Sequence, residues 1–277
     1  MTNRNKRRVI AEDTLYILDK GFFETPNGEI IDIKETQSLA ENNTIVYSPE
    51  SSDLLIKNRV DIISNNKTEI EVTKETTLNA TRRLIKEGHT DVLCLNFASA
   101  KNAGGGFLGG SQAQEESIAR STGLYNCQQK AAAYYKSNRK IRSCFYTDYM
   151  IYSPNVPIIK DEDGNNLEEL VTASIITAPA VNTGVVKHRE KDRMHEIEIV
   201  MKRRIEKVLA IALEHQHKAI VLGAWGCGVF QNKPEDIADY FKEIIETKFK
   251  NDFNKIVFAV YSKNERFIAP FYEAFGK

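Results

Sequence analysis

The run DVLCLNFA, residues 91–98, constrains the fold more than any other part of the sequence. Nearly every position in it is apolar, which is typical of a strand buried on both faces of a parallel or mixed sheet. The glycine-rich stretch GGGFLGG follows at 104–110, and a segment with helical periodicity comes next. Strand, loop and helix repeat in this order toward the C-terminus, which predicts an α/β fold with helices layered on a central sheet.

The first 75 residues show a different pattern. Residues 7–18 have helical periodicity, and residues 25–33 contain an Asn-Gly turn between short apolar runs, which indicates a hairpin. We therefore expect residues 1–75 to form a helical and hairpin extension packed on a core of residues 76–277, the two together making one structural unit.

Composition excludes several classes of protein. The chain has 38 Lys and Arg against 38 Asp and Glu, which argues against direct binding of nucleic acid. The basic segment RNKRR, residues 4–8, is interpreted as solvated. No apolar run approaches the roughly 18 residues of a membrane span, and the N-terminus has no secretory signal pattern. The cysteines and histidines lack metal-ligand spacing, and unpaired thiols predict a cytoplasmic protein. The cysteines are Cys94, Cys127, Cys144 and Cys227.

The glycines at 104–110 favour binding of a pyrophosphate. Glycine lets backbone N–H groups converge and lets a ligand approach without a Cβ in the way. The helix behind the loop adds free N–H groups and a partial positive charge. Ser111 and Gln114 have the spacing of a capping box that would begin this helix. A Walker A loop is excluded, because no Gly-Lys-Ser/Thr follows the glycines.

Two adjacent acidic residues, Glu115 and Glu116, follow in the predicted first turn of that helix. Neighbouring helical residues point about 100° apart, so the two carboxylates should not project as a symmetric pair. One can face a ligand while the other binds from the side. The simpler alternative is an acidic first turn that only complements the helix dipole.

A second glycine-rich stretch, GAWGCGVFQN at 223–232, follows another predicted strand. Because ligands in open α/β sheets bind where strand C-termini lead into loops, both stretches are expected at one site. Trp225 and Phe230 could offer aromatic faces to a base or sugar, or belong to the core. Cys227 is an alternative nucleophile, although no pattern links it to His215 or His217.

The segment GGGFLGGSQAQEE resembles the signature of poly(ADP-ribose) glycohydrolases of the compact microbial type. The segments NFASAKNAGGGFLGG, SPNVPII, ITAPAVN and GAWGCGVFQN extend this resemblance from Arg7 to about Ser262. The resemblance implies a macrodomain-like three-layer α/β/α sandwich with a mixed central sheet. It also implies hydrolysis of the ribose–ribose O-glycosidic bonds of poly(ADP-ribose), with release of ADP-ribose and no metal or cofactor.

Roles for individual residues follow from the same resemblance. Glu116 matches the general acid and base, and Glu115 matches the neighbour that holds the ribose hydroxyls. Many macrodomains have Asn-Ala-Ala-Asn before the glycines, whereas this chain has Asn-Phe-Ala-Ser, with Asn102 as the nearby candidate to replace the second Asn. The expected substrate-binding residues are Asn96, Ser99, Asn102, Gly104, Gly105, Gly106, Gln114, Gly226, Cys227, Gly228, Val229 and Phe230.

Two other functions use the same glycine loops and stay open. One is a hydrolase that removes mono-ADP-ribose from protein or nucleic acid. The other is a non-catalytic reader of ADP-ribose, which the glutamate pair argues against, because a reader needs neither carboxylate. The expected partners are poly(ADP-ribose) or ADP-ribosylated macromolecules, with ADP-ribose as the product and no membrane.

Overall fold

A mixed seven-stranded sheet lies at the centre of the computed structural model, which describes residues 2–59 and 67–276. The strand order is β3-β6-β7-β5-β8-β9-β4. The strands β7, β5, β8, β9 and β4 run parallel, and β3 and β6 are antiparallel to their neighbours. The strands are β3 (Ile45–Tyr47), β4 (Glu69–Thr73), β5 (Val92–Phe97), β6 (Met150–Lys160), β7 (Asn166–Ala178), β8 (Ala219–Leu222) and β9 (Lys255–Ala259).

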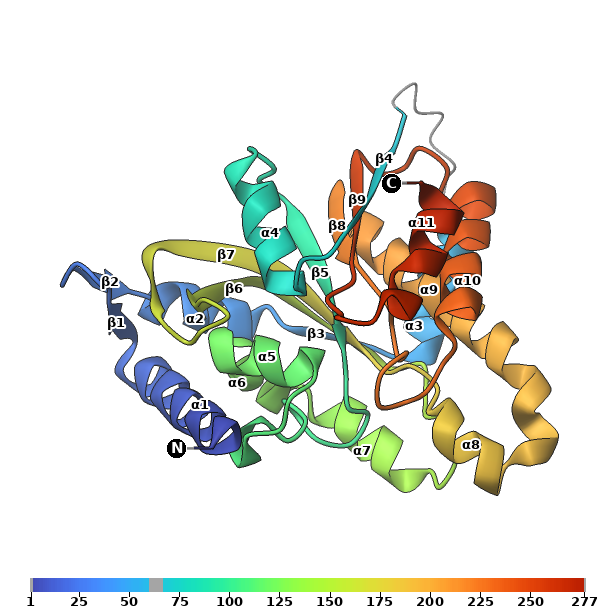
Figure 1. Ribbon diagram of the computed structural model, residues 1–277, viewed down its shortest axis with the longest axis horizontal. Helices are drawn as coiled ribbons and strands as arrows, with labels where there is room; N and C mark the ends of the chain where they lie inside the picture. Colours follow the sequence, from blue (N-terminus) through green and yellow to red (C-terminus); the bar gives the residue numbers. More distant parts are fainter. Residues whose placement is uncertain (1, 60–66, 277) are drawn as a thin grey trace.

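Helices cover both faces of the sheet (Figure 1). On one side are α1 (Asn3–Lys20), α2 (Lys34–Asn42), α4 (Thr77–Lys86), α5 (Gln114–Ser121) and α6 (Leu124–Lys130). On the other are α3 (Pro49–Asn58), α8 (Thr183–Arg189), α9 (Ile197–Glu214), α10 (Pro234–Lys248) and α11 (Ala269–Phe275). Helix α7 (Ala132–Lys140) packs near the start of β6, and three short 3-10 helices complete the fold: Phe107–Gly109, Lys191–Glu196 and Glu265–Phe267.

Strand β5 shows why the three layers form. Leu93 and Leu95 pack in the core under α9 and α10, whereas Val92 and Cys94 pack in the core under α4, α5 and α6. Successive side chains of a strand point to opposite faces of the sheet, so a continuously apolar strand is buried on both faces. The predicted α/β/α sandwich with a mixed sheet is confirmed.

The N-terminal region contains the predicted helix and hairpin. The helix α1 begins at Asn3, four residues before the predicted start, because the Thr2 hydroxyl caps it by accepting from the Asn5 N–H. The hairpin pairs β1 (Phe22–Glu24) with β2 (Ile30–Asp32). The same region also supplies β3 and β4, which lie at the two edges of the central sheet. The division at residue 75 stays a prediction.

Candidate active site

A cleft of about 710 Å³ lies where β4, β5, β8 and β9 end and both glycine stretches begin. Most of the predicted site residues line it, namely Ser99, Asn102, Gln114, Glu115, Glu116, Gly226, Cys227, Gly228, Val229 and Phe230. The cleft occupies the edge of the sheet where open α/β sheets bind ligands. The structure thus brings the two predicted loops together. Asn96, Gly104, Gly105 and Gly106 are not lining residues. Asn96, Gly105 and Gly106 lie against Glu115 or Glu116, and Gly104 contacts Gln128, which in turn contacts Glu115.

The Glu115 carboxylate is buried and firmly held. One oxygen accepts from the Ser99 N–H at 2.6 Å, and the other accepts from Asn96 Nδ2 at 3.3 Å and Gln128 Nε2 at 3.1 Å. Burial raises the pKa of Glu115 to about 8, despite these hydrogen bonds, and the charge of Glu116 acts in the same direction. Glu115 is therefore a rigid carboxyl that exchanges its proton near neutral pH.

Glu116 has a different environment one residue later. It lies half-buried on the cleft wall, and its Oε1 accepts from the Gly106 N–H at 3.0 Å. The two carboxylates therefore occupy distinct positions, as helix geometry predicts. Both carboxyls line the cleft, but Glu116 accepts from one donor and has more room to contact a bound sugar than Glu115, which accepts from three.

The glycine loop makes space for both carboxylates. Gly105 has φ of +57°, and a Cβ there would lie 2.5 Å from Glu116 Oε1 and 3.2 Å from Glu115 Oε2. Gly104 has φ of +65°, and its N–H donates to Gln128 Oε1 at 2.8 Å. Gln128 is fully buried and was not predicted as a site residue. It bridges the loop to Glu115, and nothing in the sequence near it indicates this role.

The predicted capping box at Ser111 and Gln114 is wrong. Helix α5 begins at Gln114 without a side-chain cap. Gln114 Oε1 accepts instead from the Phe97 N–H at 2.8 Å, and its Nε2 donates to the Leu95 carbonyl at 2.7 Å and to the Thr77 hydroxyl at 3.0 Å. The amide thus fixes the start of α5 to the end of β5, and with it the position of the glutamate pair.

Three arginines hold the far end of the glycine loop. Arg4 Nε donates to the Gly109 carbonyl, Arg7 Nε to the Gly110 carbonyl and Arg120 Nη1 to the Ser111 carbonyl, each at 2.8 Å. The interpretation of residues 4–8 as a solvated segment holds for the exposed Arg4 but is wrong for Arg7, which is partly buried, and both side chains bind the loop. Helix α1 is a support for the loop.

The second loop is packed from beneath. Gly226 has φ of +74°, and a Cβ there would lie 2.5 Å from Asn232 Nδ2 and 2.6 Å from the Ala180 Cβ. Asn232 is not the cap predicted for α10, which begins after Lys233. Its Nδ2 donates to two backbone carbonyls, and its Oδ1 accepts from the Thr183 hydroxyl at 2.7 Å. These contacts fix the loop on the segment that follows β7.

Cys227 is unsuited to act as a nucleophile. It is buried, and burial raises the pKa of its thiol far above the usual range. His217 lies at the other end of the sheet, where its Nδ1 contacts the Asp91 carbonyl at 2.7 Å, and His215 stays near it. Trp225 belongs to the core, where its Nε1 donates to the Ala178 carbonyl at 3.2 Å.

Aromatic side chains form one wall of the cleft. Of these, only Phe230 is predicted from the sequence. Phe230 lies 6.0 Å from Tyr146 between ring centroids, and Phe97, Tyr261 and Phe267 also line the cleft. Tyr261 follows β9, so the rule that located the glycine loops could have found it. Tyr146 is harder to find, because it is in an irregular segment with φ of +59°. Such a conformation in a non-glycine residue is common at functional sites.

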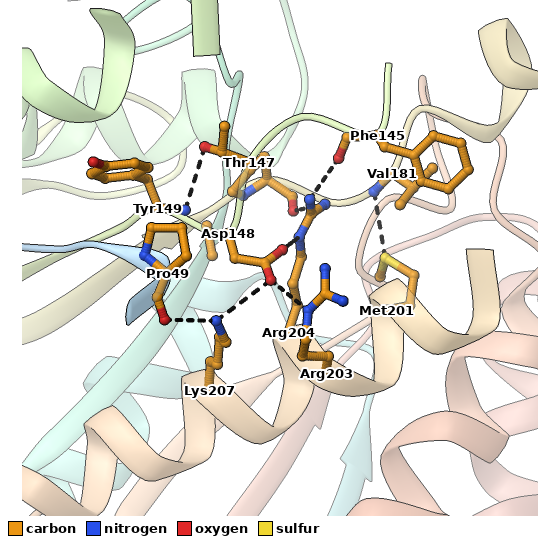
Figure 2. Close-up of polar contacts among 12 residues, drawn as sticks. Pro49, Phe145, Thr147, Asp148, Tyr149, Val181, Met201, Arg203, Arg204 and Lys207 are labelled. Carbon is orange, nitrogen blue, oxygen red and sulfur yellow. Dashed lines mark hydrogen bonds and ion pairs between the residues drawn. The ribbon is translucent and has the colours of Figure 1, made fainter. Parts of the chain in front are cut away.

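A buried ion cluster anchors the segment that carries Tyr146. Figure 2 shows Asp148 facing Arg203, Arg204 and Lys207 of α9, at 2.5, 2.9 and 3.5 Å. Burial would raise the pKa of Asp148, but the charges and hydrogen bonds of Arg204 and Arg203 outweigh it and lower the pKa to about 2. The paired charges hold this side of the cleft against the helical layer.

Within residues 2–59 and 67–276, no group of three or more His, Cys, Asp or Glu side chains is arranged to hold a metal ion. The four cysteines are free thiols. A search of the described helices finds none that is long and apolar enough to span a membrane.

Solved structures of poly(ADP-ribose) glycohydrolases share this architecture. The enzyme from Thermomonospora curvata is 39% identical over 98% of this chain and 100% of its own, with a TM-score of 0.94. Its complex with the inhibitor ADP-HPD matches at 39% identity over 97% and 99%, with a TM-score of 0.91. The Deinococcus radiodurans enzyme in complex with ADP-ribose is 39% identical over 86% and 96%, with a TM-score of 0.81.

The search of curated proteins returned no match. The sequence model described as "Microbial-type PARG, catalytic domain" matches residues 11–161, which include the first glycine loop and both glutamates. With this match and the similarity over nearly the whole chain, the protein belongs to the family of microbial-type poly(ADP-ribose) glycohydrolases.

Proposed function

We propose that this chain hydrolyses the ribose–ribose O-glycosidic bonds of poly(ADP-ribose), with Glu116 as general acid and then general base. The observation that carries the assignment is the contrast between the two adjacent carboxylates. Glu115 is buried with three hydrogen-bond donors on it, whereas Glu116 lies on the cleft with one backbone donor. Glu116, the accessible carboxyl, can exchange a proton with substrate and water. Glu115, the buried carboxyl, can hold the substrate in position.

In the proposed mechanism Glu116 protonates the oxygen that leaves as the glycosidic bond breaks. The terminal ribose becomes an oxocarbenium-like cation, which the negative charge of the nearby diphosphate stabilises. Glu116 then accepts a proton from the attacking water, and the hydroxide adds to the anomeric carbon. The carboxyl returns to its protonated form, so one residue serves both steps.

Glu115 is assigned to hold the ribose hydroxyls. It is next to Glu116 in the same helical turn, so the pair does not flank the bond as the two carboxylates of most glycosidases do. Its raised pKa near 8 means that much of Glu115 is neutral at physiological pH. A neutral carboxyl adds little repulsion toward the diphosphate.

The two glycine loops are assigned to the diphosphate and the distal ribose. Gly104–Gly106 would let the diphosphate approach the backbone because they carry no Cβ, while their N–H groups donate to Gln128 Oε1, the Asn102 carbonyl and Glu116 Oε1. Gly226, Gly228 and Val229 would contact it from the other side. Phe230 would pack on the distal ribose. The support is that the second loop lines the cleft and the first lies directly against Glu115 and Glu116, which line it, together with the complexes of relatives with ADP-ribose and ADP-HPD.

The assigned substrates are poly(ADP-ribose) and ADP-ribosylated macromolecules, and the assigned product is ADP-ribose. No cofactor takes part in these steps. We assign the chain to the cytoplasm on the basis of its four free thiols.

The decisive experiment is product analysis with Glu116→Gln, which preserves shape but removes the proton. We expect release of ADP-ribose from the polymer to fall by about 10²- to 10⁴-fold, the usual contribution of a general acid. Affinity for ADP-ribose should stay within a few-fold of wild type. Glu168→Gln, an exposed glutamate on β7, is the matched control.

Hydrolysis by Glu116→Gln at a near wild-type rate would refute the assigned acid. A wild-type protein that retains labelled polymer without releasing ADP-ribose would be a reader. Release of ADP-ribose only from mono-ADP-ribosylated substrates would identify the chain as a hydrolase that removes mono-ADP-ribose.

A further inference from the structure

A second cavity of about 600 Å³ lies beside the active-site cleft. The two hollows share Gln112, Ser117, Glu162 and Tyr261 as lining residues, so they are contiguous. Ser117 directly follows Glu116 in α5. The cavity therefore opens close to the carboxyl assigned as the acid.

Two guanidinium groups in this cavity have no acidic hydrogen-bond or salt-bridge partner among residues 2–59 and 67–276. Arg120 is only 5% exposed, and it donates to the Ser111 carbonyl, Gln112 Oε1 and Ser117 Oγ. Arg7 donates through Nε to the Gly110 carbonyl. In the part of the chain that the structure describes, all these acceptors are neutral, and neither arginine forms a salt bridge.

The charge on this pair is incompletely balanced. Burial, together with the charge of Arg7, lowers the pKa of Arg120 to about 10, and the charges of Glu116 and Glu162 offset these effects only in part. A buried cation without a paired anion is costly, so an anion that enters the cavity gains more from Arg120 than from a solvated arginine. Lys6 and Lys263 line the same cavity and are exposed.

Three acidic residues on the rim are directed elsewhere or exposed. The Asp161 carboxylate accepts from Asp163 N–H, Asn165 N–H and Asn165 Nδ2 within its own turn. Glu162 accepts from the Thr76 hydroxyl, and Asp163 is exposed. Asp161 is thus taken up by its own turn, whereas the partly exposed Arg7 and the exposed Lys6 and Lys263 line the cavity, with the buried charge of Arg120 beside them.

We propose that this cavity binds a phosphate group of the polymer unit that adjoins the terminal unit in the cleft. The proposal rests on the proposed function, because only a polymer places a second diphosphate next to the first. Each unit carries two phosphates, and arginine is the side chain best suited to hold them. Binding here orients the chain so that its end enters the cleft.

The test compares two ligands that differ by one unit. In a Glu116→Gln background, where turnover is blocked, dissociation constants are measured by calorimetry for ADP-ribose and for a polymer of two units. The variant is Lys6→Ala with Lys263→Ala, since Arg120→Met risks loss of folding through the Ser111 contact. The control variant is Lys140→Ala with Lys250→Ala, two exposed lysines outside both hollows.

We expect the two-unit ligand to bind about threefold to tenfold more weakly to the cavity variant, the usual effect of losing one or two exposed charge contacts. ADP-ribose and the control variant should be unaffected, and added salt should reduce the wild-type preference for two units. Equal losses for both ligands, or no loss, would overturn the proposal. If the otherwise unmodified protein does not release ADP-ribose from polymer, the proposed function fails instead.

Discussion

The two glycine loops look alike in the sequence, since each follows a buried strand and each borders the cleft, but their glycines serve different purposes. In the first loop Gly104 and Gly105 have φ of +65° and +57°, and a side chain at Gly105 would strike the carboxylate of Glu116, the proposed general acid. In the second loop Gly226 is required by packing against Asn232, whereas a Cβ at Gly228 would meet nothing within 4 Å.

The difference shows that the glycines of a glycine-rich run can have different structural roles. A glycine can make space for functional side chains, allow two loops to pack, or leave a surface free for a ligand. Only the third use fits the simple picture of a phosphate cradle. Substitution by alanine separates the three uses, because each predicts a loss in a different measurement.

The largest effect is expected for Gly105→Ala. The new Cβ would lie 2.5 Å from Glu116 Oε1 in a left-handed backbone conformation, so the carboxylate must move. Displacement of a catalytic group by about 1 Å can cost about a hundredfold in rate, so kcat on polymer should fall at least that far. Gly109→Ala is the control in the same loop, since its Cβ would meet only Arg4 Nη2, at 3.8 Å. Equal kcat values for the two variants would contradict the argument.

Gly226→Ala should act on stability. Its φ of +74° strains any side chain, and the Cβ would displace Asn232, which holds two carbonyls. We expect a loss of about 1–3 kcal/mol in the free energy of unfolding. Urea denaturation measures this loss directly. A variant as stable as wild type would show that the loop can shift without cost.

The first loop also carries an ionisable group that links stability to pH. Glu115 has a pKa near 8 in the folded chain, against its usual value of 4.5. Between these values the folded state binds more protons than the unfolded state, so the free energy of unfolding contributed by Glu115 decreases as pH rises. For one such group, the free energy of unfolding can fall by at most about 1.4 kcal/mol per pH unit.

Urea denaturation from pH 5 to 8.5 tests this linkage by comparison of wild type with Glu115→Gln. The stability of the variant should fall less steeply with pH, although its overall stability changes because the amide cannot accept all the hydrogen bonds now made to Oε1 and Oε2. Parallel curves for the two proteins would show that the carboxyl ionises in the fold as easily as in water.

The features that sequence could predict are local. The buried strand at 91–98, the Asn-Gly hairpin and the position of both loops follow from periodicity and turn chemistry, which act over a few residues. The divergence of Glu115 and Glu116 follows from the helical turn alone. The family resemblance supplied the sandwich around these elements.

The features that sequence could not predict depend on contacts between distant residues. The Arg4 side chain donates to a carbonyl 105 residues later in the sequence. The Gln114 side chain forms no capping box and instead accepts from the backbone of β5, 17 residues earlier. Both partners come within reach of these side chains only in the packed fold. Local propensity cannot choose among such partners, because tertiary packing decides which of them come within reach.

The smallest effect is expected for Gly228→Ala, which tests the third use of glycine. The added methyl group has open space, so the free energy of unfolding should change by less than about 0.5 kcal/mol. If the diphosphate lies over this residue, the methyl group holds it away from the backbone, and the dissociation constant of ADP-ribose should rise by about threefold to tenfold. Calorimetry on this variant and on Gly109→Ala measures the change. An unchanged affinity would place the diphosphate away from Gly228 and leave the first loop as its main contact.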